Sequence, residues 1–138
     1  MNLKFSYFLL FVLLLSAFVL AQDKNLTNGY ENGYMWRSMF GDSKMKYLSA
    51  MLERLKLPIN HFPLPDPVYC DVLINPPSTE QEIALQEVIE LIDKIYSDWL
   101  CPEVPIIFVY CYTVKKLIQG NTEEIILVRE KLLEEYCD

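Results

Sequence analysis

Apolar residues recur along much of this chain at steps of three and four positions, which is the spacing of one face of an α-helix. The first such stretch starts at a capping residue, Asp42 or Ser43, and ends near Lys56, because Pro58 disfavours continuing the helix. Its apolar face consists of Met45, Leu48, Leu52 and Leu55. The pattern predicts an amphipathic helix.

The clearest helical pattern opens at Ser78 or Thr79 and extends to Trp99. Ser78 with Gln81, and Thr79 with Glu82, both fit a capping box, in which side chains satisfy the first free N–H groups of a helix. The apolar face consists of Leu85, Val88, Ile92, Ile95 and Trp99. We predict a second amphipathic helix here.

Two more helices are predicted near the C-terminus. Residues 106–119 begin with β-branched and aromatic side chains, which by propensity alone favour a strand. Pro105 in front and Gly120 behind are typical of helix ends, so we predict a central, deeply buried helix. Asn121 is the expected cap of the last helix. The apolar face of that helix consists of Ile125, Val128, Leu132 and Tyr136.

These elements predict an all-α fold of about four helices with an antiparallel C-terminal helical hairpin. We expect a single helical domain over residues 35–138, with a Pro-rich connection over residues 57–78. Residues 22–34 carry the turn dipeptides Asn28-Gly29 and Asn32-Gly33 and are interpreted as a flexible leader.

The N-terminal apolar stretch has a different character. Phe5 to Leu20 is almost continuously apolar, Lys4 precedes it, and Ala21 before Gln22 fits a signal-peptidase site. We predict a signal peptide at residues 1–21 and an exported protein, periplasmic or secreted, with no stable membrane anchor after cleavage. The alternative is an uncleaved inner-membrane anchor through residues 5–21, at the lower length limit for spanning a bilayer.

Four cysteines in a small exported domain indicate disulfides, for which three pairings are possible. The last two helices should pack antiparallel, with Cys101 lying 19 residues before Gly120 and Cys137 lying 17 after it, at one end of the hairpin. Cys111 would fall short of Cys137 by about 12 Å along the helix axis. A disulfide needs α-carbons within about 7 Å. We predict Cys101–Cys137 and, by elimination, Cys70–Cys111, which would staple the fold.

The charge and the remaining chemistry argue against several function classes. The net charge of −7 becomes −8 once Lys4 leaves with the signal peptide, and this acidity excludes nucleic acid as a partner. The cysteine spacings and the single His61 do not fit a zinc site, and no nucleophile motif accompanies His61. Paired carboxylates such as Glu123-Glu124 and Glu134-Glu135 fall on outer helix faces. We therefore expect no catalytic, cofactor-binding or metal-binding residues, and a protein that is not an enzyme.

Two stretches carry a resemblance to known proteins. They are residues 32–55, and residues 95–125 at Ile95–Asp98, Val104–Ile106, Gly120 and Ile125. Together they resemble small exported helical proteins of bacteria and the Rap/Tai family of type VI secretion immunity proteins. The motif positions are Trp36, Lys44, Tyr47, Leu48 and Glu53. Glu53 replaces the aspartate of the pattern, and Ala50 and Arg54 stand where it favours glycine. The resemblance implies a periplasmic all-helical protein, sometimes disulfide-bonded and dimeric, some of whose relatives neutralise a toxin by binding it.

Together these observations predict an exported protein that acts by binding another protein, as an immunity-like protein or a periplasmic accessory factor. The expected partner is a basic toxin or an envelope protein, and the resemblance adds a homodimer as one possible assembly. Two alternatives are a small cell-envelope hydrolase that uses surface carboxylates and a membrane-tethered structural subunit.

Overall fold

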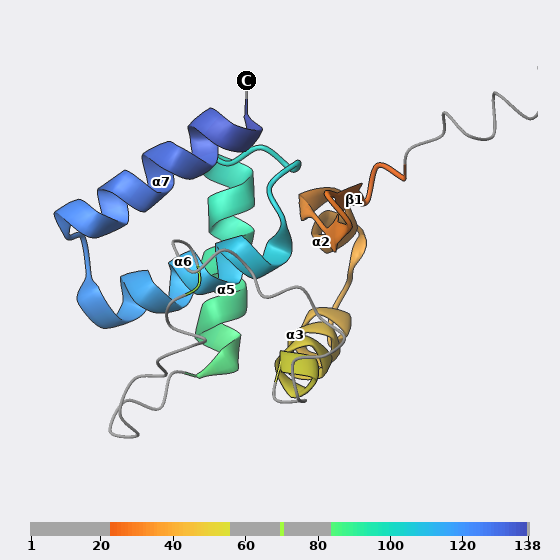
Figure 1. Ribbon diagram of the computed structural model, residues 1–138. Helices are drawn as coiled ribbons and strands as arrows, with labels where there is room; N and C mark the ends of the chain where they lie inside the picture. Colours follow the sequence, from red (N-terminus) through yellow and green to blue (C-terminus); the bar gives the residue numbers. More distant parts are fainter. Residues whose placement is uncertain (1–22, 56–69, 71–83, 138) are drawn as a thin grey trace, which may run out of the picture.

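The computed structural model describes residues 23–55, Cys70 and residues 84–137. Over these residues the chain forms five helices and one two-stranded β-hairpin, so the fold is mostly helical but not purely so (Figure 1). The elements are β1 (Leu26–Thr27), β2 (Tyr30–Glu31), α2 (Gly33–Ser38), α3 (Ser43–Leu55), α5 (Leu85–Asp98), α6 (Ile106–Gln119) and α7 (Glu123–Tyr136).

The β-hairpin corrects the prediction for residues 22–34, which carry regular structure and not only a flexible leader. Leu26 pairs with Glu31 and Thr27 with Tyr30 in an antiparallel register. The turn between them is Asn28-Gly29, with positive φ angles of 52° and 84°. Asn-Gly tolerates these angles and suits the tight turn of a two-residue hairpin.

Helix α3 confirms the first predicted helix almost residue for residue. It begins at Ser43 and is described to Leu55, and the Lys46 N–H donates to the Asp42 carbonyl oxygen in its first turn. Leu48 is fully buried, and Met51 is 7% exposed. The short helix α2 before it was not predicted.

Helix α5 begins later than predicted. Ala84 has an extended backbone with ψ of 126° and caps the helix without a side-chain hydrogen bond, so α5 does not continue back to Ser78 or Thr79. The predicted capping boxes lie outside the described residues. The predicted apolar face is confirmed at its centre, where Val88, Ile92 and Ile95 are buried, and Ile89 and Tyr96 widen it.

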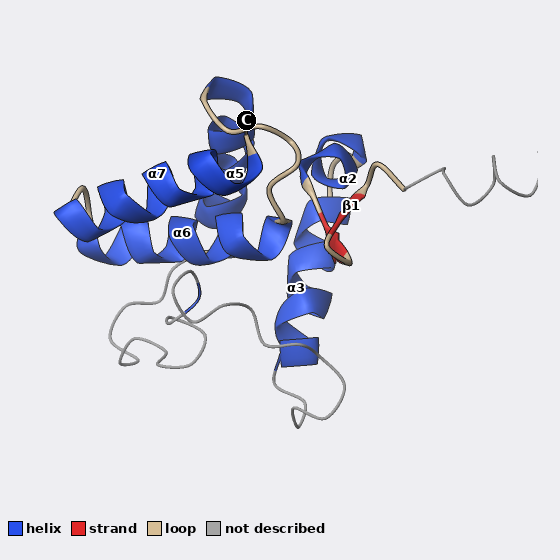
Figure 2. Ribbon diagram, turned by 45° about the horizontal axis from the view of Figure 1, so that its top comes forward, coloured by secondary structure: helices blue, strands red, loops and turns tan. Residues whose placement is uncertain are grey.

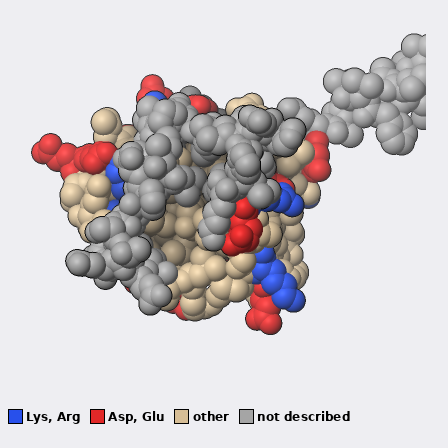
Figure 3. All heavy atoms as spheres, turned by 60° about the horizontal axis from the view of Figure 1, so that its bottom comes forward, with Lys and Arg blue, Asp and Glu red and all other residues tan. Residues whose placement is uncertain are grey.

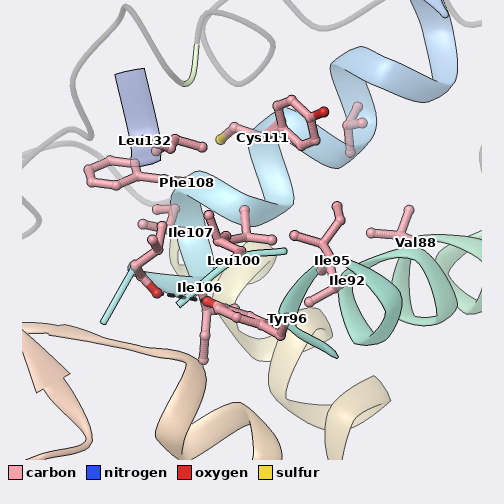
Figure 4. Close-up of a cluster of buried hydrophobic side chains, with 14 of the residues drawn as sticks. Val88, Ile92, Ile95, Tyr96, Leu100, Ile106, Ile107, Phe108, Cys111 and Leu132 are labelled. Carbon is pink, nitrogen blue, oxygen red and sulfur yellow. Dashed lines mark hydrogen bonds between the residues drawn. The ribbon is translucent and has the colours of Figure 1, made fainter. Parts of the chain in front are cut away.

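Helix α6 is the central element, with the bounds that its flanking Pro105 and Gly120 predict. Nine of its fourteen residues are buried, and it packs against both α5 and α7. Figure 4 shows Ile92 and Ile95 of α5 in the same cluster as Ile106 and Leu100. Each such side chain contributes roughly 1.5–3 kcal/mol when it leaves water, so packing outweighs the strand propensity of this sequence.

Helix α7 runs back along α6 as an antiparallel hairpin, as predicted (Figure 2). Its cap is Thr122 and not the predicted Asn121, because the Thr122 hydroxyl accepts from the Ile125 N–H at 3.4 Å. Threonine at this position has the extended backbone that a cap requires, with ψ of 164°. The buried face comprises Ile125, Val128 and Leu132, while Tyr136 is partly buried.

Two disulfides staple this arrangement with the predicted pairing. Cys101 bonds to Cys137 with a Cα–Cα distance of 5.6 Å, and Cys70 bonds to Cys111 with 5.0 Å. Disulfides persist in oxidising compartments, which supports an exported setting. Within the described residues, no helix combines the length and the apolar character needed to cross a membrane. The predicted signal peptide, His61 and all of the Pro-rich connection except Cys70 lie outside the described residues.

Candidate functional site

The junction between the hairpin and α2 is fixed by Asn32, which is 1% exposed. Its amide nitrogen donates to the Lys24 carbonyl oxygen at 2.9 Å and to the Thr27 hydroxyl at 3.0 Å. Its amide oxygen accepts from the Tyr34 N–H at 3.1 Å and so caps α2. One side chain therefore ties the β-hairpin to the first helix, which sets the position of both.

Gly33 brings the same junction against the helical core. Its N–H donates to the Pro102 carbonyl oxygen at 2.7 Å. A Cβ atom at this position would lie 2.5 Å from the Tyr96 ring and 2.8 Å from the Pro102 Cα. The site therefore requires glycine for close approach, and the Asn32-Gly33 dipeptide is a packing motif here.

A polar cluster joins α2, α3 and α5 behind this junction. The Trp36 side chain is fully buried, and its indole nitrogen donates to Oδ1 of Asp93 at 2.7 Å. The Lys44 ammonium forms an ion pair with the same oxygen and lies 5.1 Å from the centroid of the Trp36 ring. Tyr47 packs edge-on against Trp36 with ring centroids 6.4 Å apart. We refer to these four residues as the Asp93 cluster.

The cluster brings together three of the five motif residues of the family resemblance. Trp36, Lys44 and Tyr47 belong to it, and Leu48 is fully buried in the adjoining core. Glu53 is exposed on α3 and lies outside this cluster. It is also not among the residues that line a pocket found beside the cluster. Asp93 was not among the predicted site residues. The sequence feature that could have identified Asp93 is its position four residues after Ile89, which is buried. This spacing places the Asp93 carboxylate at the edge of the buried face of α5.

A pocket of about 160 Å³ lies beside the Asp93 cluster and shares Tyr47 with it. It is formed by β2, α2, α3 and the first turn of α6. Its apolar lining consists of Tyr30, Met35, Ala50, Met51 and Ile107. The two ionic residues that line it are Glu31 and Arg54, and we call it the Glu31–Arg54 pocket.

Tyr47 orients the acidic side of this pocket. Its hydroxyl donates to Oε2 of Glu31 at 3.2 Å. Burial, followed by the negative charge of Glu31, raises the pKa of Tyr47 well above its usual value, while Arg54 lowers it slightly. The phenol therefore stays protonated and keeps donating at neutral pH. The hydrogen bond holds one carboxylate oxygen of Glu31 in place at the wall of the pocket.

Arg54 supplies the opposite charge. It is exposed on α3, and within the described part of the chain it forms no hydrogen bond or ion pair. Figure 3 shows acidic and basic side chains beside one another at several points along the margin of one face of the molecule.

A second surface of interest is the outer face of α7, an outermost helix in Figures 1 and 2. Ile126 is 50% exposed and Leu127 is 65% exposed. The surrounding acidic side chains are also exposed, as predicted for an outer helix face: Glu123, Glu124, Glu130, Glu134 and Glu135. We call these seven residues the α7 surface. At one end of it, Glu124 pairs with the buried ammonium of Lys115 at 2.5 Å.

The described residues contain no group of three or more His, Cys, Asp or Glu side chains that could hold a metal ion. No protein-family model, curated protein or solved structure matches this chain. The resemblance to the Rap/Tai family accordingly stays a prediction that rests on the motif residues alone.

Proposed function

We propose that this is an exported protein that acts by binding a basic protein partner through the α7 surface. The observation that carries the proposal is the exposure of two adjacent large apolar side chains, Ile126 and Leu127, in the middle of a row of glutamates. The two disulfides support the exported setting.

The composition of the α7 surface fits protein recognition. Apolar side chains at the centre of a polar rim give a contact that can lose its water on binding, while the rim provides orientation. Five glutamates against Arg129 and Lys131 make α7 acidic, and Arg129 is occupied by stacking over the Trp99 ring at 4.5 Å. An acidic rim attracts a partner rich in lysine and arginine and accelerates its association.

This role corresponds to an immunity-like protein or a periplasmic accessory factor, whose partner would be a basic toxin or an envelope protein. We prefer it to a hydrolase because the paired glutamates are exposed on α7, where water solvates each carboxylate. A second copy of this chain is a weaker partner for the α7 surface, because two such surfaces would bring like charges together.

The test is a pull-down with the disulfide-bonded protein from an extract of exported proteins, followed by mass spectrometry. The variant carries Ile126→Ser and Leu127→Ser together. Phe40→Ser is the matched control, because Phe40 is 81% exposed and lies outside α7. We expect a partner with more basic than acidic residues to bind the wild type and the control, with binding at least tenfold weaker for the double variant. Equal recovery by all three proteins, or recovery of no specific partner, would contradict the proposal.

A further inference from the structure

We propose that the Glu31–Arg54 pocket binds a small zwitterion, namely a free α-amino acid with an apolar side chain. This activity goes beyond the proposed function, because the pocket is built by β2, α2, α3 and α6, whereas the protein partner is assigned to α7.

The size of the pocket sets the size of its ligand. Its volume is about 160 Å³. An apolar cavity of about 150 Å³ accommodates one benzene-sized group, whereas drug-sized ligands occupy roughly 300–1,000 Å³. The space therefore suits a single amino-acid side chain and its backbone at the mouth, and it is too small for a nucleotide.

The apolar lining selects the side chain of that ligand. Met51 and Ile107 are 7% and 4% exposed and supply the most buried part of the lining, while Met35 is half-buried. Methionine has three rotatable bonds and a polarizable sulfur, so it adapts to ligands of different shape. Two methionines in so small a pocket favour aliphatic or aromatic side chains without demanding one of them.

The two charges select the backbone of the ligand. Glu31, held by Tyr47 through one oxygen, offers the other to an ammonium group, and the Arg54 guanidinium suits a carboxylate. A ligand with only a positive charge would be repelled by Arg54, and one with only a negative charge by Glu31. A molecule whose ammonium and carboxylate groups are bonded to the same carbon satisfies both residues, and this arrangement defines a free α-amino acid.

The experiment compares three ligands by isothermal titration calorimetry on the full disulfide-bonded protein. L-leucine carries both charges, N-acetyl-L-leucine lacks the ammonium, and L-leucinamide lacks the carboxylate. We expect leucine to bind at least tenfold more tightly than either derivative. Failure of leucine to bind, or equal binding of all three ligands, would overturn the proposal.

Two variants assign each charge to its residue. Glu31→Gln keeps an acceptor for Tyr47 and should remove the preference for leucine over N-acetyl-leucine. Arg54→Gln should remove the preference for leucine over leucinamide, and its exposure makes a folding defect unexpected. Glu87→Gln and Lys46→Gln are charge-matched controls at exposed positions outside both the pocket and the α7 surface, and they should bind leucine like the wild type.

If both pocket variants kept the preference of the wild type for leucine over its two derivatives, the assignment of the site to this pocket would be refuted. This holds even if the protein binds amino acids elsewhere. The pull-down through the α7 surface is read independently, so a failed pull-down leaves the calorimetric result standing and the reverse also holds. A thermal unfolding curve without ligand checks that each variant is folded before titration.

Discussion

Trp36 and Asp93 lie 57 residues apart in the sequence, yet the indole N–H of one donates to the carboxylate of the other at 2.7 Å. The same carboxylate oxygen holds the Lys44 ammonium, whose position over the Trp36 ring adds a cation–π contact. A single acidic group thereby satisfies a fully buried N–H and links three helices.

We predict that Asp93→Ala lowers the free energy of unfolding by about 1–3 kcal/mol, because it leaves the buried Trp36 N–H without an acceptor. Asp93→Asn should lower it less, since the amide oxygen still accepts while the ion pair with Lys44 is lost. Urea unfolding followed by tryptophan fluorescence measures both. Lys94→Ala, at an exposed neighbouring position, should stay within about 0.5 kcal/mol of the wild type. Equal stability of the alanine and asparagine variants would contradict the role of the hydrogen bond.

Gly33→Ala should destabilise the protein by about 1–3 kcal/mol, because the new methyl group overlaps the Tyr96 ring and the Pro102 backbone. Alanine is normally the better helix former, so a gain in stability would be the outcome if space were available. Ser49→Ala on α3 is exposed and serves as the control for helix propensity. The midpoint of thermal unfolding distinguishes the two results.

The two disulfides should differ in their resistance to reduction. Cys101 and Cys137 are partly exposed, whereas Cys70 and Cys111 are fully buried. Exchange requires a thiolate to reach a sulfur atom, so a mild reductant should open Cys101–Cys137 first. Timed alkylation followed by peptide mapping identifies the order, and earlier labelling of Cys70 and Cys111 would contradict it.

Stability should fall in alkaline solution. Burial is the main cause that raises the pKa of Tyr47 and of Tyr96 above the value in an unfolded chain, which is about 10. The folded state therefore keeps protons that the unfolded state releases. The associated stability is fully present below about pH 10 and is lost as the pH rises further towards the folded-state pKa values.

Unfolding in urea at a series of pH values checks this alkaline loss, with tyrosinate absorbance as a second readout. Tyr47→Phe should lower the free energy of unfolding near neutral pH, because it removes the hydrogen bond to Glu31. Above about pH 10, the free energy of unfolding of this variant should fall less steeply with pH than that of the wild type. If the free energy of unfolding of this variant fell with pH as steeply as that of the wild type, Tyr47 would not contribute to the alkaline loss of stability.

Local signals in the sequence predicted helix α6 correctly. Pro105 and Gly120 mark its ends, and these residues act through their own backbone angles, so no distant contact is needed to interpret them. The same logic missed the β-hairpin, because Asn28-Gly29 is compatible with both a tight turn and a flexible segment. What decides between them is the long-range contact of Asn32 with Pro105, which periodicity does not reveal.

The candidate site was predicted only in part. Disulfide pairing followed from helix geometry, and the motif residues Trp36, Lys44 and Tyr47 do lie together. Glu31 and Arg54 were not identified as a pair, because they belong to separate elements and nothing in their spacing indicates a shared pocket. Side chains that meet only through tertiary packing leave no repeating signal along the chain.

The Cys101–Cys137 bond closes α6 and α7 into a covalent ring, and Cys111 within that ring is tied to Cys70. The exposed turn at Gly120 and Asn121 is the natural place for a protease to cut this hairpin. A cut there would leave the C-terminal piece attached through Cys137, so the helices would stay aligned. A nicked protein should therefore migrate as one species without reductant and as two pieces with it, and it should survive proteases that would disable an unlinked hairpin.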